Sequence, residues 1–245
     1  MAAAPAFALL HGGGQGSWGW DDVAASLRAS DAVVLALDVP GCGVKRGRDV
    51  SAITADEIAA ELIADCRAAG LRDVILVGHS LAGSILPRMA AQAPDLFARL
   101  VYLTCSAPLP GVSFRGQMGE GLQGSHPDQV GWVVDPDTHS TDARYRLMFC
   151  NDMSEAFATA FLAKMGADIW PMDPLTCTDH SYDHLAALPS TYIVCLQDAG
   201  LPPHWQRTFA GRLHCQRIIE IDSGHQAMTT QPAALVELLL AEARA

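Results

Sequence analysis

Long apolar runs are missing from this sequence. Half of its 245 residues are hydrophobic, yet no run approaches the roughly 18 residues that a membrane-spanning helix needs. The opening residues, MAAAPAFALL, have no basic group and only a short apolar stretch, which is not the pattern of a secretory signal. We therefore expect a protein that has no membrane partner and is located in the cytoplasm.

Basic residues are also scarce. The chain has 16 Lys and Arg against 27 Asp and Glu, which gives a formal net charge of −11. No cluster of Lys and Arg offsets this charge locally, and a negative field repels the phosphates of a nucleic acid. We expect no nucleic-acid partner and look instead for a small-molecule substrate.

Paired cysteines and metal-binding clusters are missing as well. The seven cysteines are scattered and include no C-x-x-C pair, so we expect reduced, structural thiols. His180 and His184 stand four residues apart with Asp183 between them, a spacing that could hold a metal on a helix. No third ligand set accompanies this pair, so a solvated surface is the favoured interpretation. The sequence implies neither a metal nor another cofactor.

Short β-rich apolar runs alternate with amphipathic segments along most of the chain. This alternation predicts βα units and a doubly wound α/β fold with a mostly parallel sheet. Thr54 and Glu57 have the spacing of a capping box and predict a helix behind them. The other expected elements are strands at Phe7–Leu10, Val33–Leu37, Val74–Val77, Leu100–Leu103, Tyr192–Cys195 and Arg217–Ile221, and helices at Trp20–Arg28, Leu81–Gln92, His204–Arg212 and Ala233–Arg244.

The alternation stops in the middle of the chain and resumes about 80 residues later, a gap too long for a plain loop in a compact domain. We expect residues 1–107 and 186–245 to form the α/β core. Residues 108–185 are then an inserted, largely helical cap, with one helix over Ser154–Met165.

A candidate nucleophile follows the third expected strand. The sequence Gly78-His79-Ser80-Leu81-Ala82 between a strand and a helix is typical of a nucleophile elbow, in which the Ser stands on a strained turn. Small neighbours are needed there, and Ala82 departs from the usual Gly. The alternative interpretation is a Gly-Ser turn that merely caps a helix.

Two later strands end near residues that could complete a catalytic triad. Asp198 follows the fifth expected strand and His225 the sixth, which is the order Ser, acid, His of this arrangement. Carboxyl ends of parallel strands converge on one crevice, so topology would bring the three residues together. Asp222 is a rival acid, but it precedes His225 too closely to reach its ring from another strand. Singly, Asp198 is explained as a loop acid and His225 as a surface histidine; jointly they favour a triad.

The glycines after the first strand predict an oxyanion hole. A glycine can turn its N–H toward a ligand with no Cβ in the way, so we expect the N–H groups of Gly13 and Leu81 to be the donors. A helix beginning at Leu81 would add its positive dipole end.

The same loop contains Gly14-Gln15-Gly16-Ser17-Trp18-Gly19, which matches a dinucleotide fingerprint, with Asp38 about 20 residues on. Trp18 and Trp20 would crowd a pyrophosphate at this loop, so a nicotinamide cofactor is not expected.

Five stretches resemble the plant methylesterase and hydroxynitrile lyase branch of the α/β-hydrolases, together with its bacterial esterase relatives. The resemblance spans nearly the whole chain. It implies an α/β-hydrolase fold, a Ser80–His225–Asp198 triad, oxyanion donors at Gly13 and Leu81, and a cofactor-independent esterase that acts on small, rather apolar esters. The stretches are HGGGQGSWGW from His11, DVPGCG from Asp38, GHSLAG from Gly78, NDMS from Asn151 and GHQAM from Gly224.

Departures from the lyases favour ester hydrolysis over cyanohydrin cleavage. The lyases of this branch have a Thr at the position of Gly12 and a Lys directly after the catalytic His, where this chain has Gln226. We expect Gly12, Trp132, Met153 and Gln226 to line the substrate pocket. A hydroxynitrile lyase and a small-molecule receptor with the hydrolase fold stay open as alternatives, and so does association into a homodimer.

Overall fold

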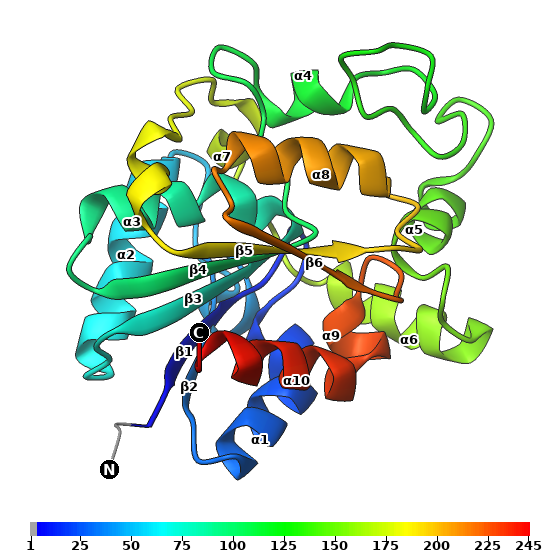
Figure 1. Cartoon of the computed structure of the whole chain (residues 1–245). Helices are drawn as coiled ribbons and strands as arrows, with labels where there is room; N and C mark the ends of the chain where they lie inside the picture. Colours follow the sequence, from blue (N-terminus) through cyan, green and yellow to red (C-terminus); the bar gives the residue numbers. More distant parts are fainter. Residues whose placement is uncertain (1–3) are drawn as a thin grey trace.

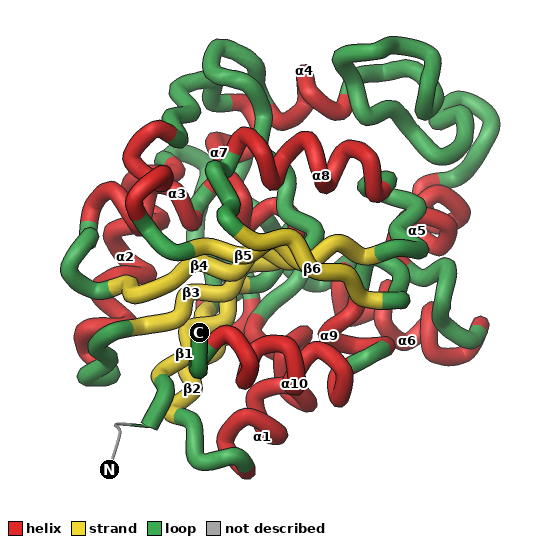
Figure 2. The backbone as a smooth tube through the Cα atoms, viewed as in Figure 1, coloured by secondary structure: helices red, strands yellow, loops and turns green. Residues whose placement is uncertain are grey.

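A six-stranded parallel sheet in the order β2-β1-β3-β4-β5-β6 forms the centre of the computed structural model, which describes residues 4–245. Figure 1 and Figure 2 show the sheet as a twisted layer between two layers of helices. The predicted doubly wound α/β fold is confirmed, with every strand parallel. The strands are β1 (Ala6–Leu10), β2 (Val33–Leu37), β3 (Val74–His79), β4 (Phe97–Leu103), β5 (Ser190–Cys195) and β6 (Arg217–Ile221).

Helices cover both faces of the sheet (Figure 1). Because successive strand residues point to opposite faces, each strand contributes to two cores. Leu76 of β3 packs in the core of one face, whereas its neighbour Val77 packs in the core of the other. One face carries α2 (Ala55–Ala68), α3 (Leu86–Gln92) and α8 (Pro203–Arg212), and the other carries α1 (Asp21–Ala29), α9 (Ala227–Thr230) and α10 (Pro232–Glu242).

The central strand β3 is buried along its whole length, as expected of a parallel strand covered on both faces. At the start of α2, the Thr54 hydroxyl accepts a hydrogen bond from the Glu57 N–H, and the Glu57 carboxylate accepts one from the Thr54 N–H at 2.8 Å. The predicted capping box is therefore present.

Residues 104–189 connect β4 to β5. Figure 1 shows α5 and α6 beyond the carboxyl ends of the strands, whereas α4 lies over α8. Ser154 caps α6, so the helix predicted over Ser154–Met165 is confirmed. The division into a core and a cap stays a prediction. The helices of this connection are α4 (Phe114–Met118), α5 (Thr141–Phe149), α6 (Glu155–Met165) and α7 (Asp173–Thr176).

The helix expected over Leu81–Gln92 is not continuous. A 3₁₀ turn, Ser80–Ser84, follows β3, and α3 begins only at Leu86. Pro87 explains the break, because it has no N–H to donate to the carbonyl of Gly83 and its ring would crowd that carbonyl inside a helix. The prediction that an α-helix begins at Leu81 and adds its dipole there is therefore wrong. Leu81 lies in a short 3₁₀ turn instead.

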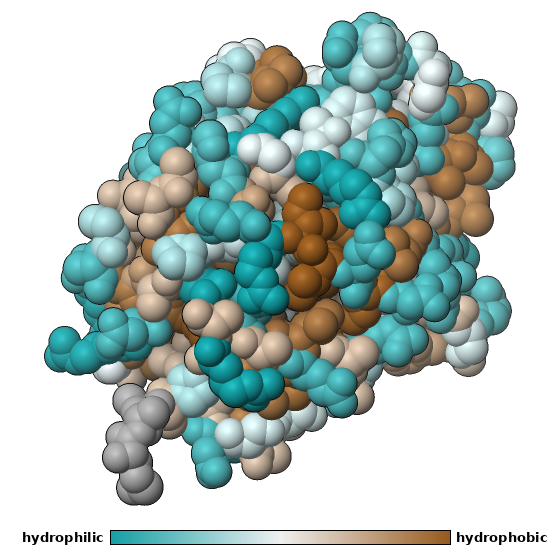
Figure 3. Space-filling model, viewed as in Figure 1, coloured by the Kyte–Doolittle hydropathy of each residue, from teal (hydrophilic) through white to brown (hydrophobic). Residues whose placement is uncertain are grey.

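The surface is mostly hydrophilic on the side shown in Figure 3, with hydrophobic atoms gathered near its centre. On the edge strand β6, the side chain of Ile218 is exposed. None of the helices within residues 4–245 combines the length and the hydropathy that a bilayer-spanning segment requires.

A pair of glycine substitutions tests how tightly the turn after β3 is packed. A Cβ on Gly83 would overlap the carbonyl oxygen of Ser106, whereas a Cβ on Gly211 in α8 would meet nothing within 4 Å. We expect Gly83→Ala to lower the free energy of unfolding by about 2–3 kcal/mol, the cost of overpacking. Gly211→Ala should instead raise it by about 0.5–1 kcal/mol, because alanine loses less backbone freedom in a helix.

Urea denaturation of the two variants measures both values. Equal effects of the two substitutions would contradict the tight contact between Gly83 and Ser106.

Candidate active site

Ser80 stands on a strained turn directly after β3. Its φ is +53°, a left-handed backbone conformation that residues other than glycine rarely adopt. The turn is tight: a Cβ on Gly78 would lie 2.6 Å from Cδ1 of Leu86 and 3.0 Å from the Cβ of Ala82. Ala82 is therefore accommodated in the usual glycine position because Gly78 has no side chain.

The structure brings Ser80, His225 and Asp198 together. The Ser80 Oγ lies 3.0 Å from Nε2 of His225, and Nδ1 of His225 lies 2.7 Å from Oδ2 of Asp198. The three residues follow β3, β6 and β5, whose carboxyl ends meet at one edge of the sheet. In this arrangement the imidazole can take the hydroxyl proton while the carboxylate orients the ring.

The Asp198 carboxylate is buried and surrounded by donors. Besides His225, it accepts hydrogen bonds from the Thr104 hydroxyl at 2.6 Å, the Gln206 amide at 3.4 Å and the N–H groups of Gly200 and Leu201 at 2.9 and 2.8 Å. These bonds replace the water that a buried charge would lose.

Sequence reasoning missed Thr104 and Gln206. Thr104 directly follows β4 and has a φ of +40°, so it is a second strained residue at the edge where the strands end. Its place after a strand was the available signal. No sequence pattern distinguishes Gln206 within α8.

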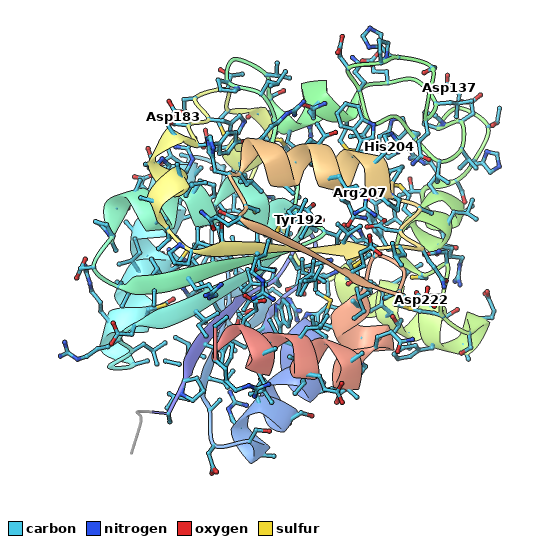
Figure 4. All side chains as sticks on the ribbon, viewed as in Figure 1. Asp137, Asp183, Tyr192, His204, Arg207 and Asp222 are labelled. Carbon is cyan, nitrogen blue, oxygen red and sulfur yellow. The ribbon has the colours of Figure 1, made fainter. Side chains whose placement is uncertain are left out.

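The rival acid Asp222 lies apart from this group. Figure 4 labels Asp222 at the carboxyl end of β6. Its side chain is exposed, and it accepts a hydrogen bond from the Gln197 amide at 2.6 Å. Its contacts therefore differ from those of Asp198, which reaches the His225 ring.

Two glycines line the other side of Ser80. A Cβ on Gly12 would lie 2.8 Å from Nδ1 of His79 and 2.9 Å from the Cβ of Ser80, and one on Gly13 would overlap the Leu81 side chain. The Gly13 N–H makes no hydrogen bond within residues 4–245. The predicted donors Gly13 and Leu81 therefore lie next to each other, on the loop after β1 and in the turn after β3.

Two aspartates hold the loop that contains these glycines. Asp38 accepts hydrogen bonds from the Ser17 N–H at 2.6 Å and from the Ser17 hydroxyl at 2.9 Å. Asp168, from the connection between β4 and β5, accepts from the Trp18 indole at 2.9 Å and from the Arg46 guanidinium. The Ser17 N–H, which lies inside the dinucleotide-like motif, thus donates its hydrogen bond to Asp38 of the protein itself.

An aromatic side chain covers the histidine of this group. The Phe149 ring, at the end of α5, lies 5.1 Å from the His225 ring. Met153, one of the residues predicted to line the pocket, packs with Phe149 against the apolar cluster of Cys150 and Phe161. No sequence signal separates Phe149 from the other apolar residues of this connection.

The other predicted pocket residues have different surroundings. Trp132 forms an isolated β-bridge with Leu122. The Arg144 guanidinium lies over the Trp132 ring, 5.1 Å from the ring centre. Within residues 4–245, none of its hydrogen bonds or ring contacts involves the triad residues. Gln226 is 1% exposed, and its Oε1 accepts a hydrogen bond from Gln15 at 2.9 Å.

The histidine pair considered for a metal lies away from these residues. Nε2 of His184 is 2.8 Å from the carbonyl oxygen of Pro87, and His180 stacks on Tyr182. In the described part of the chain, no three His, Cys, Asp or Glu side chains are grouped to hold a metal ion.

Two further histidines are fully enclosed. His79 donates from Nε2 to the His225 carbonyl at 2.9 Å, and His11 donates from Nδ1 to the Gly12 carbonyl at 2.8 Å. Burial lowers the pKa of both imidazoles from the usual value of about 6.5, and for His79 the neighbouring His225 lowers the pKa further. Both side chains are therefore neutral in the folded protein near neutral pH.

Known proteins resemble this chain over most of its length. The family model described as the alpha/beta hydrolase family matches residues 7–238. Methylesterase 2 of Arabidopsis thaliana is 26% identical over 251 residues, which cover 96% of this chain and 94% of the relative.

Two solved structures share the architecture. An extracellular α/β-hydrolase from a Paenibacillus species superposes with a TM-score of 0.79 at 25% identity, covering 97% of this chain and 98% of the other. A pyrethroid hydrolase from Sphingobium faniae JZ-2 superposes with a TM-score of 0.78 at 23% identity, covering 99% of this chain and 98% of the other. The similarity to this second structure shows a shared fold.

The enclosed histidines predict a loss of stability in mild acid. Below about pH 6.5 the unfolded chain binds protons at His79 and His11 that the folded protein does not bind, so stability falls as the pH falls and is full above this value. Each such histidine contributes up to about 1.4 kcal/mol per pH unit. Urea denaturation between pH 7.5 and pH 5 should show this decline, and His79→Gln should make it less steep. Equal slopes for the two proteins would contradict the neutral state of His79.

Proposed function

The chain belongs to the α/β-hydrolase family and is a serine-type ester hydrolase, and we propose that Ser80, His225 and Asp198 form its catalytic triad. The observation that carries this assignment is the unbroken line of hydrogen bonds from the Ser80 hydroxyl through both nitrogens of His225 to Asp198. The strained conformation of Ser80 supports it, since strain of this kind is stored at functional sites.

The proposed reaction proceeds through an acyl-enzyme. The Ser80 Oγ attacks the ester carbonyl carbon while Nε2 of His225 accepts the hydroxyl proton. The carbonyl oxygen becomes an oxyanion, which accepts hydrogen bonds from the N–H groups of Gly13 and Leu81. The C–O bond to the alcohol then breaks, and His225 returns the proton to the leaving alcohol. Water repeats the same steps on the acyl-enzyme and releases the acid.

Asp198 has an orienting role in this mechanism. Its Oδ2 accepts from Nδ1 of His225, so the other ring nitrogen is left free to receive the Ser80 proton. The carboxylate also stabilises the imidazolium that forms. Four further donors, from Thr104, Gln206, Gly200 and Leu201, hold the carboxylate in place.

We further propose that the substrates are small, rather apolar carboxylic esters. Phe149 supplies apolar surface beside His225, and Met153 packs against the same apolar cluster as Phe149; ligand pockets are mostly lined by such residues. Methylesterase 2 of Arabidopsis thaliana, to which the chain is similar, is named for the hydrolysis of methyl esters. Residues 108–185, in this proposal, are a cap that covers the site.

The proposed location is the cytoplasm. The seven cysteines are free thiols, and five of them are buried. Reducing conditions keep thiols in this form.

Cyanohydrin cleavage is the competing reaction for the same triad, and two residues disfavour it. A side chain at position 12 would press on His79 and Ser80, so the Thr of the lyases has no room here. Gln226 supplies no positive charge for a leaving cyanide, and its Oε1 is engaged by Gln15. A charge-assisted hydrogen bond worth about 1.5–3 kcal/mol is thereby missing.

Replacing the nucleophile tests the triad. We expect Ser80→Ala to lower kcat for a p-nitrophenyl ester by at least about a thousandfold, because only the oxyanion donors and binding remain. Ser30→Ala, at an exposed position after α1, is the matched control and should keep wild-type kcat. Circular dichroism verifies that both variants fold. More than about one hundredth of wild-type activity in Ser80→Ala would contradict the assignment.

A comparison of two substrates distinguishes hydrolase from lyase. We expect kcat/KM for a p-nitrophenyl or methyl ester to exceed that for mandelonitrile cleavage under the same conditions, because the proposed backbone donors would stabilise an acyl oxyanion, whereas Gln226 has no charge to stabilise a leaving cyanide. A larger value for mandelonitrile would overturn the esterase proposal. Tight ligand binding with negligible turnover of graded esters would instead favour a receptor.

A further inference from the structure

The residue before the nucleophile contacts the base of the triad. His79 is the last residue of β3, and its side chain is 1% exposed. Its Nε2 lies 2.9 Å from the main-chain carbonyl oxygen of His225, and the two imidazole rings meet edge to face with centres 4.8 Å apart. His79 therefore links the turn that presents Ser80 to the loop that presents His225.

This hydrogen bond defines the protonation of His79. A carbonyl oxygen can only accept, so Nε2 must carry the hydrogen. Nδ1 then has a lone pair, and it is buried without a partner in the described part of the chain. A second proton on Nδ1 would have no acceptor and would place a positive charge beside the His225 ring. Burial and His225 accordingly keep the pKa of His79 well below its usual value.

The main chain at His225 has few other supports. Its flanking residues are tied elsewhere: the Gly224 N–H donates to Asp152 at 2.7 Å, and the Gln226 carbonyl accepts from the Thr229 and Thr230 N–H groups. Within residues 4–245, the His225 carbonyl accepts a hydrogen bond from His79 alone. Asp198 orients the ring through its side chain, so the two contacts hold different parts of the same residue.

We propose that His79 is a positioning residue of the ester hydrolase, which fixes the main chain of His225 relative to Ser80 by donating a hydrogen bond from Nε2 to the His225 carbonyl. The inference rests on the triad proposed above. Because His79 and Ser80 are consecutive, this bond connects the nucleophile to the base by a short rigid path. It maintains the 3.0 Å distance from the Ser80 Oγ to Nε2 of His225 across which the proton moves.

Gly12 fits the same arrangement. A Cβ there would lie 2.8 Å from Nδ1 of His79, so the ring would have to move. The absence of a side chain at position 12 leaves room for the His79 ring in the position from which Nε2 reaches the His225 carbonyl.

The substitutions His79→Gln and His79→Met test the proposal. Gln places an amide N–H near the position of Nε2, whereas Met has a similar length and no donor. We expect H79Q to keep kcat within about threefold of the wild type, and H79M to lose about 10- to 100-fold in kcat, as small misplacements of reacting groups do. KM should change little in either variant, because His79 does not face the substrate.

Ester turnover and labelling of Ser80 by a fluorophosphonate should fall in parallel in H79M, since both require the base. Failure of the wild type to hydrolyse esters or to be labelled would refute the proposed function itself. Normal wild-type activity combined with wild-type kcat in H79M, or with equal losses in H79Q and H79M, would overturn the positioning role alone. Equal midpoints of thermal unfolding for the two variants verify that stability does not cause the difference.

A measurement on the wild type covers the case in which H79M does not fold. Ring nitrogen chemical shifts from NMR should show His79 neutral, with the hydrogen on Nε2, from pH 5.5 to pH 8. The neutral Nδ1–H tautomer has no hydrogen on Nε2 to donate to the His225 carbonyl, so finding it in this range would overturn the proposal.

Discussion

The turn at Ser80 is the constraint on which the rest of the site depends. A left-handed φ at a residue with a Cβ persists only when surrounding packing leaves no alternative. Gly78 and Gly83 permit that packing, because a Cβ on the first would press on Leu86 and one on the second would overlap Ser106. The fully buried strand β3 anchors the turn from one side, and α3, which begins at Leu86, follows it on the other. The Ser80 hydroxyl is thereby presented at the edge of the sheet where the neighbouring strands also end.

The hydrogen bonds that hold the site come from segments far apart in the chain. One group of them surrounds Asp198, and another holds the loop after β1. Hydrogen-bond donors from Thr104 after β4, from α8 and from the loop after β5 surround Asp198, which allows a carboxylate to be buried next to His225. The loop after β1 is held by Asp38 and Asp168 through Ser17 and Trp18. Each acid satisfies donors that would otherwise be left unpaired near the proposed oxyanion hole. Hydrogen bonds that take no part in the proposed reaction thus hold Asp198 and the loop after β1 in position.

Local chemistry explains which features the sequence could predict. Alternation of apolar residues, a capping box and glycine-rich turns act within a few residues, so the strands, the fold and the capping of α2 follow from sequence neighbours alone. The candidate residues Ser80, Asp198 and His225 were identified for the same reason, since each comes shortly after a recognisable strand. The helix predicted over Leu81–Gln92 begins only at Leu86, because Pro87 cannot donate a hydrogen bond to the preceding turn.

The sequence by itself determined the order of the strands along the chain, the residues at their ends and the small residues of the nucleophile turn. Only the tertiary structure decided which side chains meet there. Phe149 contacts His225 while Trp132 packs under Arg144, although both are aromatic residues of the same connection. Thr104 meets Asp198, and His79 meets His225, because the parallel strands end at the same edge of the sheet. The contacts of Thr104 and His79 join residues dozens of positions apart, and their geometry depends on how the whole sheet twists and packs, which no local pattern encodes.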